Sequence, residues 1–416
     1  MPVGGKAIVL GGGTFFHVRP HLALAAPAFG TTADQIGAML RQKGWEDTTV
    51  VKTRMAGGDA SLVTNNDVAK LLNLILQDRN VKVLVMNVAL CDFEGSIANE
   101  NGLTLSGKDQ PRLKTSEGGQ VMQLVPADKL LGRIRKERKD IFLVGFKTTA
   151  GASYEEQYRA GLELLKKSSC NLVFANDVQT RQQMIITPEQ AIYGESMHRY
   201  EALELLAQMT TERANLTFTR STVVEGKAVP WSATEVPASL RKVVDHLIKR
   251  GAYKPFLGST VGHFAVKVAE GRFLTSIRKS NFNKLDETGL VLVESMGNDR
   301  VIAHGARPSV GGQSQRLIFG DHPDTDCIVH AHVPLRDEAG VIPIVPQRPY
   351  ECGSHECGKN TSEGLHDFGG GLKAVMLDQH GPNVVFNRNM DPDRVIEFIE
   401  RNWDLTRSTD GVLTAP

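Results

Sequence analysis

Apolar and polar residues follow a repeating pattern in the first half of this chain. Short apolar runs, typical of buried strands in parallel sheets, occupy residues 6–10, 48–52, 81–88, 141–146 and 172–175. Stretches with helical spacing lie between them, at residues 67–78, 130–139 and 154–167, and a further helix is expected to begin near Thr31 or Thr32 behind a hydroxyl cap. This alternation predicts an α/β fold with a doubly wound, Rossmann-like parallel sheet.

The second half of the chain has a different pattern. Residues 259–266, 272–276, 289–294, 325–333 and 372–377 are spaced as strands, whereas residues 237–250, 313–319 and 393–405 are spaced as helices. This order predicts an α/β (α+β) domain with a mainly antiparallel sheet. Residues 218–236 lack a steady period and suggest a terminal hairpin or linker. We therefore expect a first domain over residues 1–215, a linker over 216–236 and a second domain over 237–416.

Size and composition narrow the class of protein. The chain has 416 residues, 41% of them hydrophobic, and a net charge of +1, which offers no basic field to attract nucleic acid. No apolar stretch approaches membrane-spanning length, and the first residues lack a signal-peptide layout, so we expect a cytoplasmic protein without a membrane partner. Five cysteines are an odd number and argue against a disulfide framework.

Two histidines one residue apart suggest a metal site. His330 and His332 lie in an apolar, β-branched run, and side chains two residues apart on a strand share a face. His380, followed by Gly381 at the end of another expected strand, adds a third imidazole. Three such ligands with an open fourth position suit Zn²⁺ or another divalent metal. The alternatives are exposed or core-edge histidines for the pair and a turn histidine for His380.

Polar residues at expected strand ends suggest a nucleotide site in the first half. Gly11, Gly12, Gly13 and Thr14 follow the first expected strand, and a glycine turn between strand and helix can present backbone N–H groups to a phosphate. A tight turn without a ligand is the alternative. Further polar residues at positions 87–92, 145–148 and 176–177 fall where ligands of parallel sheets bind.

Five segments in order make the first half resemble the phosphopantothenate–cysteine ligase family. They cover residues 10–14 with 18–19, then 88–93, 112–114, 144–147 and 174–178. The resemblance implies that CTP or ATP binds here and that an acyl-nucleotide forms on a carboxylate. It implies these nucleotide-binding residues: Gly11, Gly12, Gly13, Thr14, Asp92, Arg112, Lys114, Asp128, Phe146 and Asn176.

One segment departs from that family. Where the family has Asn-x-Ser-Ser-Gly before its first helix, this chain has Ala26-Pro27-Ala28-Phe29-Gly30, which offers neither an amide nor a hydroxyl side chain. Two interpretations of the first domain follow. It is either a nucleotide-dependent ligase or a module that retains the nucleotide alone.

The second half resembles the class II aldolase and adducin family. The motifs are His330-Ala331-His332, His380-Gly381, and the segments 258–264, 274–276 and 307–309. The resemblance implies metal-assisted cleavage, epimerisation or dehydration of phosphorylated sugars, or the lost catalysis of adducin, in a tetrameric homo-oligomer. It implies these substrate-binding residues: Thr275, Ser276 and Ser309. Arg278 and Lys279, where this chain departs from the family's Thr-x-Ser-Gly segment, could pair with a phosphate or carboxylate. Solvated surface charges are the alternative for Arg278 and Lys279.

The acid/base residue of that family has no counterpart here. The family has a glutamate after Pro-Ser, whereas this chain continues Val310-Gly311-Gly312-Gln313-Ser314-Gln315, and glutamine cannot shuttle a proton as a carboxylate does. Other acids or bases are needed, and the candidates are His263, His355, Glu351 and Glu356.

A cysteine-rich segment allows two interpretations. Residues 350–357 hold Cys352, His355 and Cys357, which lack the second ligand pair of a closed structural zinc site. We expect a loop that lines the main pocket instead.

The sequence favours a bifunctional metabolic enzyme. The second domain would perform zinc-dependent aldolase or lyase chemistry on a small phosphorylated or carboxylated substrate, beside a CTP- or ATP-binding first domain. The alternative is a non-catalytic, adducin-like assembly protein or a nucleotide-binding protein.

Overall fold

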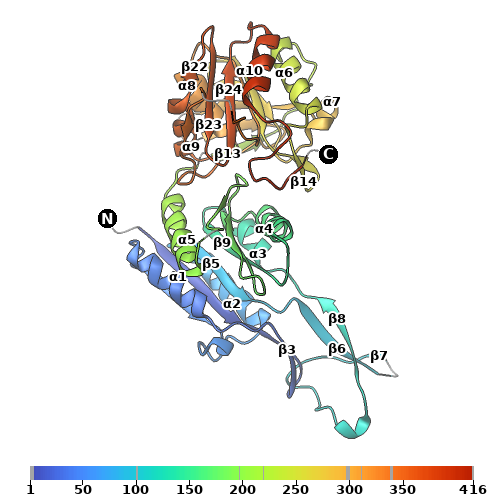
Figure 1. Ribbon diagram of the computed structural model, residues 1–416. Helices are drawn as coiled ribbons and strands as arrows, with labels where there is room; N and C mark the ends of the chain where they lie inside the picture. Colours follow the sequence, from blue (N-terminus) through green and yellow to red (C-terminus); the bar gives the residue numbers. More distant parts are fainter. Residues whose placement is uncertain are drawn as a thin grey trace. The chain divides into compact units, whose positions relative to one another are not determined.

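The chain divides into two units in the computed structural model, which describes residues 4–99, 102–195, 197–218, 220–296, 300–310, 312–337 and 341–414 (Figure 1). The first unit comprises Met1–Ile186 and Tyr193–Ala214. The second comprises Thr187–Ile192 and Asn215–Pro416, so it includes a short segment from the middle of the first half of the chain. No helix in the described ranges combines the length and apolar character needed to cross a bilayer.

A seven-stranded sheet organises the first unit. Its order is β12-β11-β10-β9-β5-β1-β4, and the five strands from β10 to β4 are parallel. The strands are β1 (Lys6–Gly13), β4 (Thr48–Lys52), β5 (Val81–Ala89), β9 (Phe142–Thr149), β10 (Leu172–Asp177), β11 (Gln183–Ile186) and β12 (Ile192–Tyr193). The chain order of the parallel strands reverses between β1 and β5, where ligands bind in doubly wound folds. The predicted α/β class is confirmed.

Helices cover this sheet on both faces. They are α1 (Thr31–Gln42), α2 (Asn65–Gln77), α3 (Leu131–Glu137), α4 (Tyr154–Ser168) and α5 (Arg199–Ala214). Helix α1 packs against α5, while α3 packs against α2 and α4. The amphipathic spacing explains the packing, since Ile36, Met39 and Leu40 on α1 are all buried.

The glycine run lies in a strand, which corrects the expected turn. Strand β1 continues through Gly13, and a hairpin of β2 (Phe15–Arg19) and β3 (Leu22–Ala25) separates it from α1. A Cβ atom on Gly13 would lie 1.9 Å from the carbonyl oxygen of Ala26, so the close passage of residues 26–28 requires glycine. The N-cap of α1 is Gly30 in the left-handed region, with no side-chain hydrogen bond, whereas the sequence suggested a hydroxyl cap.

Two smaller sheets complete the described elements of the first unit. The strands β6 (Phe93–Asn99), β7 (Gly102–Leu103) and β8 (Val121–Pro126) form a three-stranded antiparallel sheet that contacts the β2–β3 hairpin. Short 3₁₀ helices occupy Arg54–Ala56 and Thr115–Glu117.

A ten-stranded, mainly antiparallel sheet organises the second unit, as the sequence predicted. Its order is β13-β19-β18-β17-β16-β20-β24-β23-β21, with β22 on β23. The strands are β13 (Arg220–Val224), β16 (His263–Ala269), β17 (Arg272–Ser276), β18 (Leu290–Ser295), β19 (Arg300–His304), β20 (Cys327–His330), β21 (Ile344–Val345), β22 (His366–Asp367), β23 (Leu372–Leu377) and β24 (Gly381–Phe386). Strand β13 lies in the segment expected as a linker and pairs in parallel with β19.

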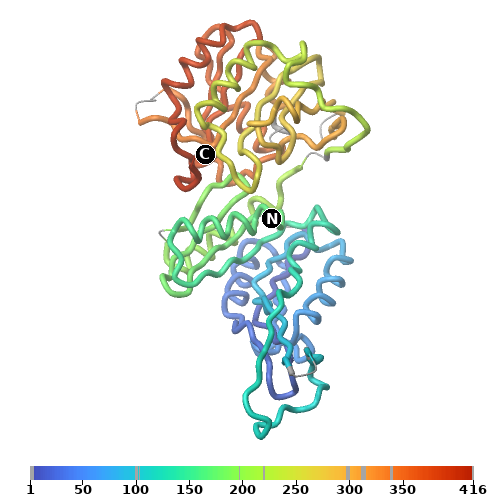
Figure 2. The backbone as a smooth tube through the Cα atoms, turned by 90° about the vertical axis from the view of Figure 1, so that its right-hand side faces the viewer, coloured from blue at the N-terminus to red at the C-terminus, as the bar shows by residue number. Residues whose placement is uncertain are grey.

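Alternating side chains bury both faces of this sheet, whose backbone lies in the yellow-green to red part of Figure 2. Phe264 and Val266 of β16 face a core that includes α6 (Ala238–Lys249) and α10 (Pro392–Asn402). Ala265, between them, faces a second core that includes α8 (Gly312–Asp321), which packs against α9 (His355–Gly364). The period of two therefore assigns successive residues to opposite helical layers. Smaller elements are β14 (Pro255–Phe256), β15 (Ser259–Thr260), a 3₁₀ turn at Phe282–Lys284, and α7 (Leu285–Thr288).

Asp177 at the end of β10 fixes the loops at the carboxyl edge of the first sheet. Its carboxylate accepts backbone N–H groups of Gly151, Ala152, Gln179 and Thr180 at 2.9–3.0 Å. Burial alone would raise the pKa of this carboxyl, but its hydrogen bonds, chiefly from the backbone N–H groups of Thr180, Ala152 and Gly151, outweigh burial and hold the pKa below its usual range. The charged form is therefore part of the folded structure.

We predict that Asp177→Ala destabilises the protein at neutral pH but not in strong acid. Because the folded-state pKa is depressed, the stabilisation by Asp177 is present above the unfolded pKa of about 3.9 and is lost as pH falls through the folded value. Urea unfolding of the wild type and the variant at a series of pH values measures this difference. The exposed Asp109→Ala variant is the control, and a pH-independent gap for Asp177→Ala contradicts the prediction.

Candidate metal centre

Strand pairing aligns three polar side chains near one end of the second sheet. His330, the last residue of β20, pairs with His263 of β16 on one side and with Asn383 of β24 on the other. Directly paired residues on neighbouring strands share a face, so these side chains lie in one row. The rings of His263 and His330 are 4.7 Å apart between centroids.

His332 and His380 complete a group of three imidazoles. His332 lies two residues beyond the end of β20, and His380 lies in the tight turn between β23 and β24. The ring centroids are 5.1 Å apart for His330 and His332, 4.6 Å for His330 and His380, and 4.8 Å for His332 and His380. One ring nitrogen from each lies within 4.8 Å of the others, and all three side chains are buried.

A glycine allows the turn to approach this closely. Gly381 has φ of +142°, and a Cβ atom there would lie 2.1 Å from the carbonyl oxygen of Ala331 and 3.1 Å from the Cα of His332. Any side chain would push the two ligand-bearing segments apart. The His-Gly pair in the sequence therefore has a steric basis.

Hydrogen bonds at the Nδ1 atoms of His330 and His332 leave the Nε2 lone pairs available as metal ligands. His330 Nδ1 lies 3.0 Å from the carbonyl oxygen of Pro382, which can only accept, so Nδ1 carries the proton. His330 Nε2 is then a lone-pair donor, and it is buried without a hydrogen-bond partner among the described residues. His332 Nδ1 lies 2.9 Å from Gln190 Oε1, which is also an acceptor. Burial lowers the pKa of His330 to about 4, so this imidazole is neutral near pH 7.

Thr409 joins the backbones of two of these histidines. Its N–H donates to the carbonyl oxygen of His332 and its hydroxyl donates to that of His380, both at 3.1 Å. Asp410 holds this tail in place by accepting the N–H groups of Val412 and Leu413. The site therefore depends on residues about 30 to 80 positions away in the chain.

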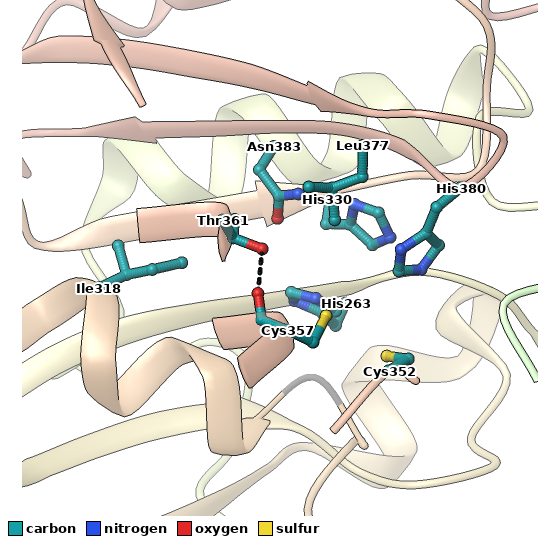
Figure 3. Close-up of a pocket in the computed structure, with 9 residues that line it drawn as sticks. All are labelled: His263, Ile318, His330, Cys352, Cys357, Thr361, Leu377, His380 and Asn383. Atoms are coloured by element: carbon teal, nitrogen blue, oxygen red, sulfur yellow. Dashed lines mark hydrogen bonds between the residues drawn. The ribbon is translucent and has the colours of Figure 1, made fainter. Parts of the chain in front are cut away.

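The cavity beside these histidines lacks a carboxylate among its described lining residues (Figure 3). Cys352 and Cys357 form part of its wall, and Cys357 lies in the first turn of α9, whose N-cap is Ser354. The segment 350–357 thus borders this cavity, although residues from His355 onward are helical rather than a loop. In the described part of the chain, the three histidines are the one group placed to hold a metal. The lining residues are His263, Ile318, His330, Cys352, Cys357, Thr361, Leu377, His380 and Asn383.

Of the four acid/base candidates, one reaches the cavity. His263 lines it, and Gln315 Nε2 lies 2.8 Å from His263 Nδ1. Burial and the neighbouring His330 hold the pKa of His263 well below its usual value. His355 is half-buried on α9, Glu351 is buried, and the Glu356 carboxylate accepts the Thr217 N–H at 3.0–3.1 Å, but none of these three lines the cavity.

The expected substrate-binding residues lie at the end of β17 and beside it. Thr275 is buried and its hydroxyl donates to Phe264, while the Ser276 hydroxyl is buried with no partner among the described residues. Ser309 N–H donates to the Ser276 carbonyl oxygen. Lys279 has a left-handed backbone.

An arginine pair emerges at the same place. The Arg278 N–H donates to the carbonyl oxygen of Arg307 at 2.9 Å, and desolvation, followed by the positive charge of Arg307, lowers the pKa of Arg278. Such a pair suits an anion, since a phosphate or carboxylate would relieve the repulsion. The sequence motif contained Arg307 but gave it no role. Gly311, in the segment where the family glutamate would fall, lies outside the described residues.

The expected nucleotide residues form two groups in the first unit. Gly11, Gly12 and Gly13 pair within the sheet, and Thr14 is buried, with its hydroxyl bonded to Asn65 and to the N–H of Cys91, so these four residues hold the strand ends together. The others lie nearer the surface: Asp92 pairs with Lys129, Arg112, Lys114 and Asp128 are exposed, and Phe146 and Asn176 are half-buried.

Sequence reasoning missed a cation at the start of α1. Arg199 of α5 donates to the Thr32 hydroxyl at 3.2 Å, and its guanidinium carbon lies 5.6 Å from the centre of the Phe174 ring. The N-terminus of α1 has no side-chain cap. Because Arg199 bonds to Thr32 in the first turn, its guanidinium lies near the first N–H groups of this helix. No local pattern connects residues 167 positions apart, so this pairing needed the fold.

Comparisons with known proteins match both halves of the chain. Residues 248–336 match the family model of the Class II Aldolase and Adducin N-terminal domain. The N-terminal half matches the Coenzyme A biosynthesis bifunctional protein CoaBC of Thermococcus kodakarensis with 22% identity over 181 residues, 42% of this chain and 42% of that protein. The match thus spans less than half the length of that curated relative. Both resemblances noted in the sequence are confirmed.

Two solved structures represent the same two similarities. The DNA/pantothenate metabolism flavoprotein from Streptococcus pneumoniae is 18% identical and matches with a TM-score of 0.41, covering 49% of this chain and 97% of that one. An L-fuculose 1-phosphate aldolase is 17% identical and matches with a TM-score of 0.31, covering 41% of this chain and 83% of that one.

We predict that the purified protein binds one Zn²⁺ or similar divalent ion per chain and that each of His330→Ala, His332→Ala and His380→Ala abolishes stoichiometric binding. Loss of one of three ligands should cost more than the ~10–100-fold that loss of an outer-shell partner costs. Competition with a chromophoric chelator measures the affinity. His366→Ala, on an exposed histidine of β22, should bind as the wild type does. Equal binding by all four variants would place the metal elsewhere.

Proposed function

We propose that this protein is a bifunctional-looking metabolic enzyme whose second unit is a metal-dependent lyase of the class II aldolase type. The observation that carries the proposal is the group of three buried imidazoles with ligand atoms within 4.8 Å of one another. The family match over residues 248–336 supports it, because that match includes His330 and His332. The substrate class is a small phosphorylated or carboxylated compound, and the reaction is aldol cleavage or condensation, dehydration or epimerisation.

The metal fits the donor set. His330, His332 and His380 would hold it, and when bound it supplies Lewis-acid stabilisation to an oxygen that gains negative charge beside the reacting carbon. The buried His330 Nε2 with no described partner is the structural reason for the assignment. Burial of all three rings would exclude bulk water from that oxygen.

His263 is the residue of this chain that we assign to contact the substrate at the cavity wall. Gln315 is fully buried, and its amide nitrogen can only donate, so His263 Nδ1 accepts and Nε2 carries the ring proton. His263 therefore offers a neutral N–H donor to a substrate oxygen. Gln315 fixes this tautomer, whereas a carboxylate at this position would accept a proton from Nδ1.

Arg278 and Arg307 are proposed to bind the phosphate or carboxylate of the substrate. Their backbones are hydrogen-bonded to each other, both side chains are exposed, and fork-shaped guanidinium donors recognise such oxygens in pairs. Thr275 is less suited to direct contact because its hydroxyl already bonds Phe264.

We predict that the metal-loaded protein exchanges a carbon-bound proton next to a carbonyl group. Dihydroxyacetone phosphate and small 2-oxo acids in D₂O are the probes, and NMR records deuterium uptake. His330→Ala should abolish exchange, His263→Asn should lower kcat by about 10²-fold, within the range for lost proton-transfer or oxyanion contacts, and Arg278→Ala should mainly raise KM. Lys284→Ala, on a lysine of the 3₁₀ turn at Phe282–Lys284, is the control. Absence of exchange with every probe at full metal occupancy contradicts the lyase proposal.

A non-catalytic, adducin-like role is the second candidate. The described cavity lining contains no carboxylate, and no glutamate follows Pro308-Ser309 in residues 310–315. The same exchange experiment decides between the two, because an assembly protein would bind metal without exchange. The tetramer implied by the family resemblance stays a prediction, which light scattering at known concentration would measure.

For the first unit we propose binding of CTP or ATP. The doubly wound sheet, the uncapped N-terminus of α1 and the adjacent Arg199 together suit a phosphate chain. The match to a coenzyme A biosynthesis protein supports a nucleotide-dependent ligase. Residues 26–30 offer no amide or hydroxyl side chain, so a module that binds the nucleotide without ligation is the other form of this proposal.

We predict that CTP or ATP with Mg²⁺ raises the melting temperature of the protein and that Arg199→Ala weakens nucleotide binding by roughly tenfold, the cost of about 1.4 kcal/mol expected for one charge-assisted contact. Calorimetric titration measures the affinity. Arg133→Ala removes an exposed arginine of α3 that bonds Asn73 and should leave it unchanged. No stabilisation by either nucleotide would argue against both forms of the proposal.

A further inference from the structure

The segment Thr187–Ile192 brings residues from the first half of the sequence into the second unit. It connects β11 to β12, and it is folded tightly: the Gln190 N–H donates to the Thr187 carbonyl oxygen at 3.0 Å, and the Thr187 N–H donates to that of Ala191 at 3.2 Å. Gln190 is fully buried and has a left-handed φ of +71°. A buried, non-glycine residue in this conformation is strained, and the surrounding structure must hold it there.

Two side chains of this segment bond to the surroundings of the metal centre. Gln190 Oε1 lies 2.9 Å from His332 Nδ1. The carboxylate of the neighbouring Glu189, which is also buried, accepts the N–H of Cys352, a residue of the cavity wall. The segment therefore contacts one candidate ligand directly and the cavity wall beside it.

We infer that Gln190 is a positioning residue of the metal centre. An amide oxygen can only accept, so the bond keeps the proton of His332 on Nδ1 and leaves the Nε2 lone pair for the ion. In the same way, the backbone carbonyl of Pro382 accepts from His330 and keeps the ring proton on Nδ1. For His332, the acceptor is a side chain supplied by residues that precede the rest of the second unit by more than 20 positions.

This assignment rests on the proposed metal site but is separable from it. The three histidines determine whether an ion binds, whereas Gln190 determines the tautomer and orientation of one ligand. The position of the His332 ring proton can also be measured in protein stripped of metal, so the effect of the bond has a readout separate from metal binding.

The test compares Gln190→Ala and Gln190→Glu with the wild type in the full-length protein. Zn²⁺ affinity is measured by chelator competition, and ring ¹⁵N NMR of the metal-free protein reports which nitrogen of His332 carries the proton, with His332→Gln identifying the signals. We expect Gln190→Ala to weaken Zn²⁺ binding by ~10–100-fold, as for other outer-shell partners, and to shift the proton toward Nε2. Gln190→Glu, which keeps an acceptor, should bind Zn²⁺ at least as tightly as the wild type does and retain the Nδ1 proton.

Two controls separate positioning from general destabilisation. Gln157→Ala removes another fully buried glutamine, on α4, and should leave Zn²⁺ affinity unchanged. Glu189→Gln keeps an acceptor for Cys352 and should also bind normally. If Gln190→Ala fails to fold, the wild-type tautomer and Gln190→Glu still decide the question.

The outcomes are distinct. Wild-type protein that binds no Zn²⁺ overturns the metal site and this role together. Wild-type binding with equal affinity in Gln190→Ala, or weaker binding in Gln190→Glu than in Gln190→Ala, overturns the role of Gln190 alone.

Discussion

The candidate metal centre of the second unit depends on the hydrogen bonds that two of its clustered histidines make through Nδ1. His330 donates to Pro382 and His332 to Gln190, and each bond assigns the proton to Nδ1. Without these bonds, neutral imidazoles in a buried cluster could present N–H groups to one another, and no shared lone-pair site would exist. Burial lowers the pKa of His330 to about 4, so this ring stays neutral near pH 7 and its Nε2 remains unprotonated. Tautomer control is therefore the condition for any metal chemistry here.

Backbone packing imposes the second condition, a close approach of separate segments. Gly381 lets the β23–β24 turn lie against Ala331, and Thr409 then bonds the carbonyl groups of His332 and His380. The antiparallel register also contributes, because it aligns His330 with His263 on β16 and with Asn383 on β24. In the first unit, Gly13 has a comparable function, because it admits residues 26–28 against β1.

The spacing of apolar residues and of histidines along the chain predicted those features that depend on neighbouring residues. Apolar periodicity predicts the sheets and most helices. The spacing of His330 and His332 predicts that pair, and His380 was predicted from its place before Gly381 at the end of an expected strand. The glycine run was misread as a turn, because neighbouring strands, not the glycines themselves, decide that β1 continues. Strand β24 was missed since Pro382 and Asn383 disfavour strands in isolation. Gln190 carries no local signal, because only the tertiary fold brings it to a histidine 142 residues away.

His263 and His330 lie in the same row but carry the ring proton on different nitrogens, so they suit different functions. The ring centroid of His263 lies 4.7 Å from that of His330 and both side chains are buried, so proximity alone would suggest a fourth ligand. Its Nδ1, however, accepts from Gln315, so its outward nitrogen bears a proton and cannot coordinate an ion. Gln315 thus makes the histidine beside the three clustered imidazoles a neutral hydrogen-bond donor. Such a donor would suit a substrate oxygen that gains negative charge next to a metal held by those imidazoles.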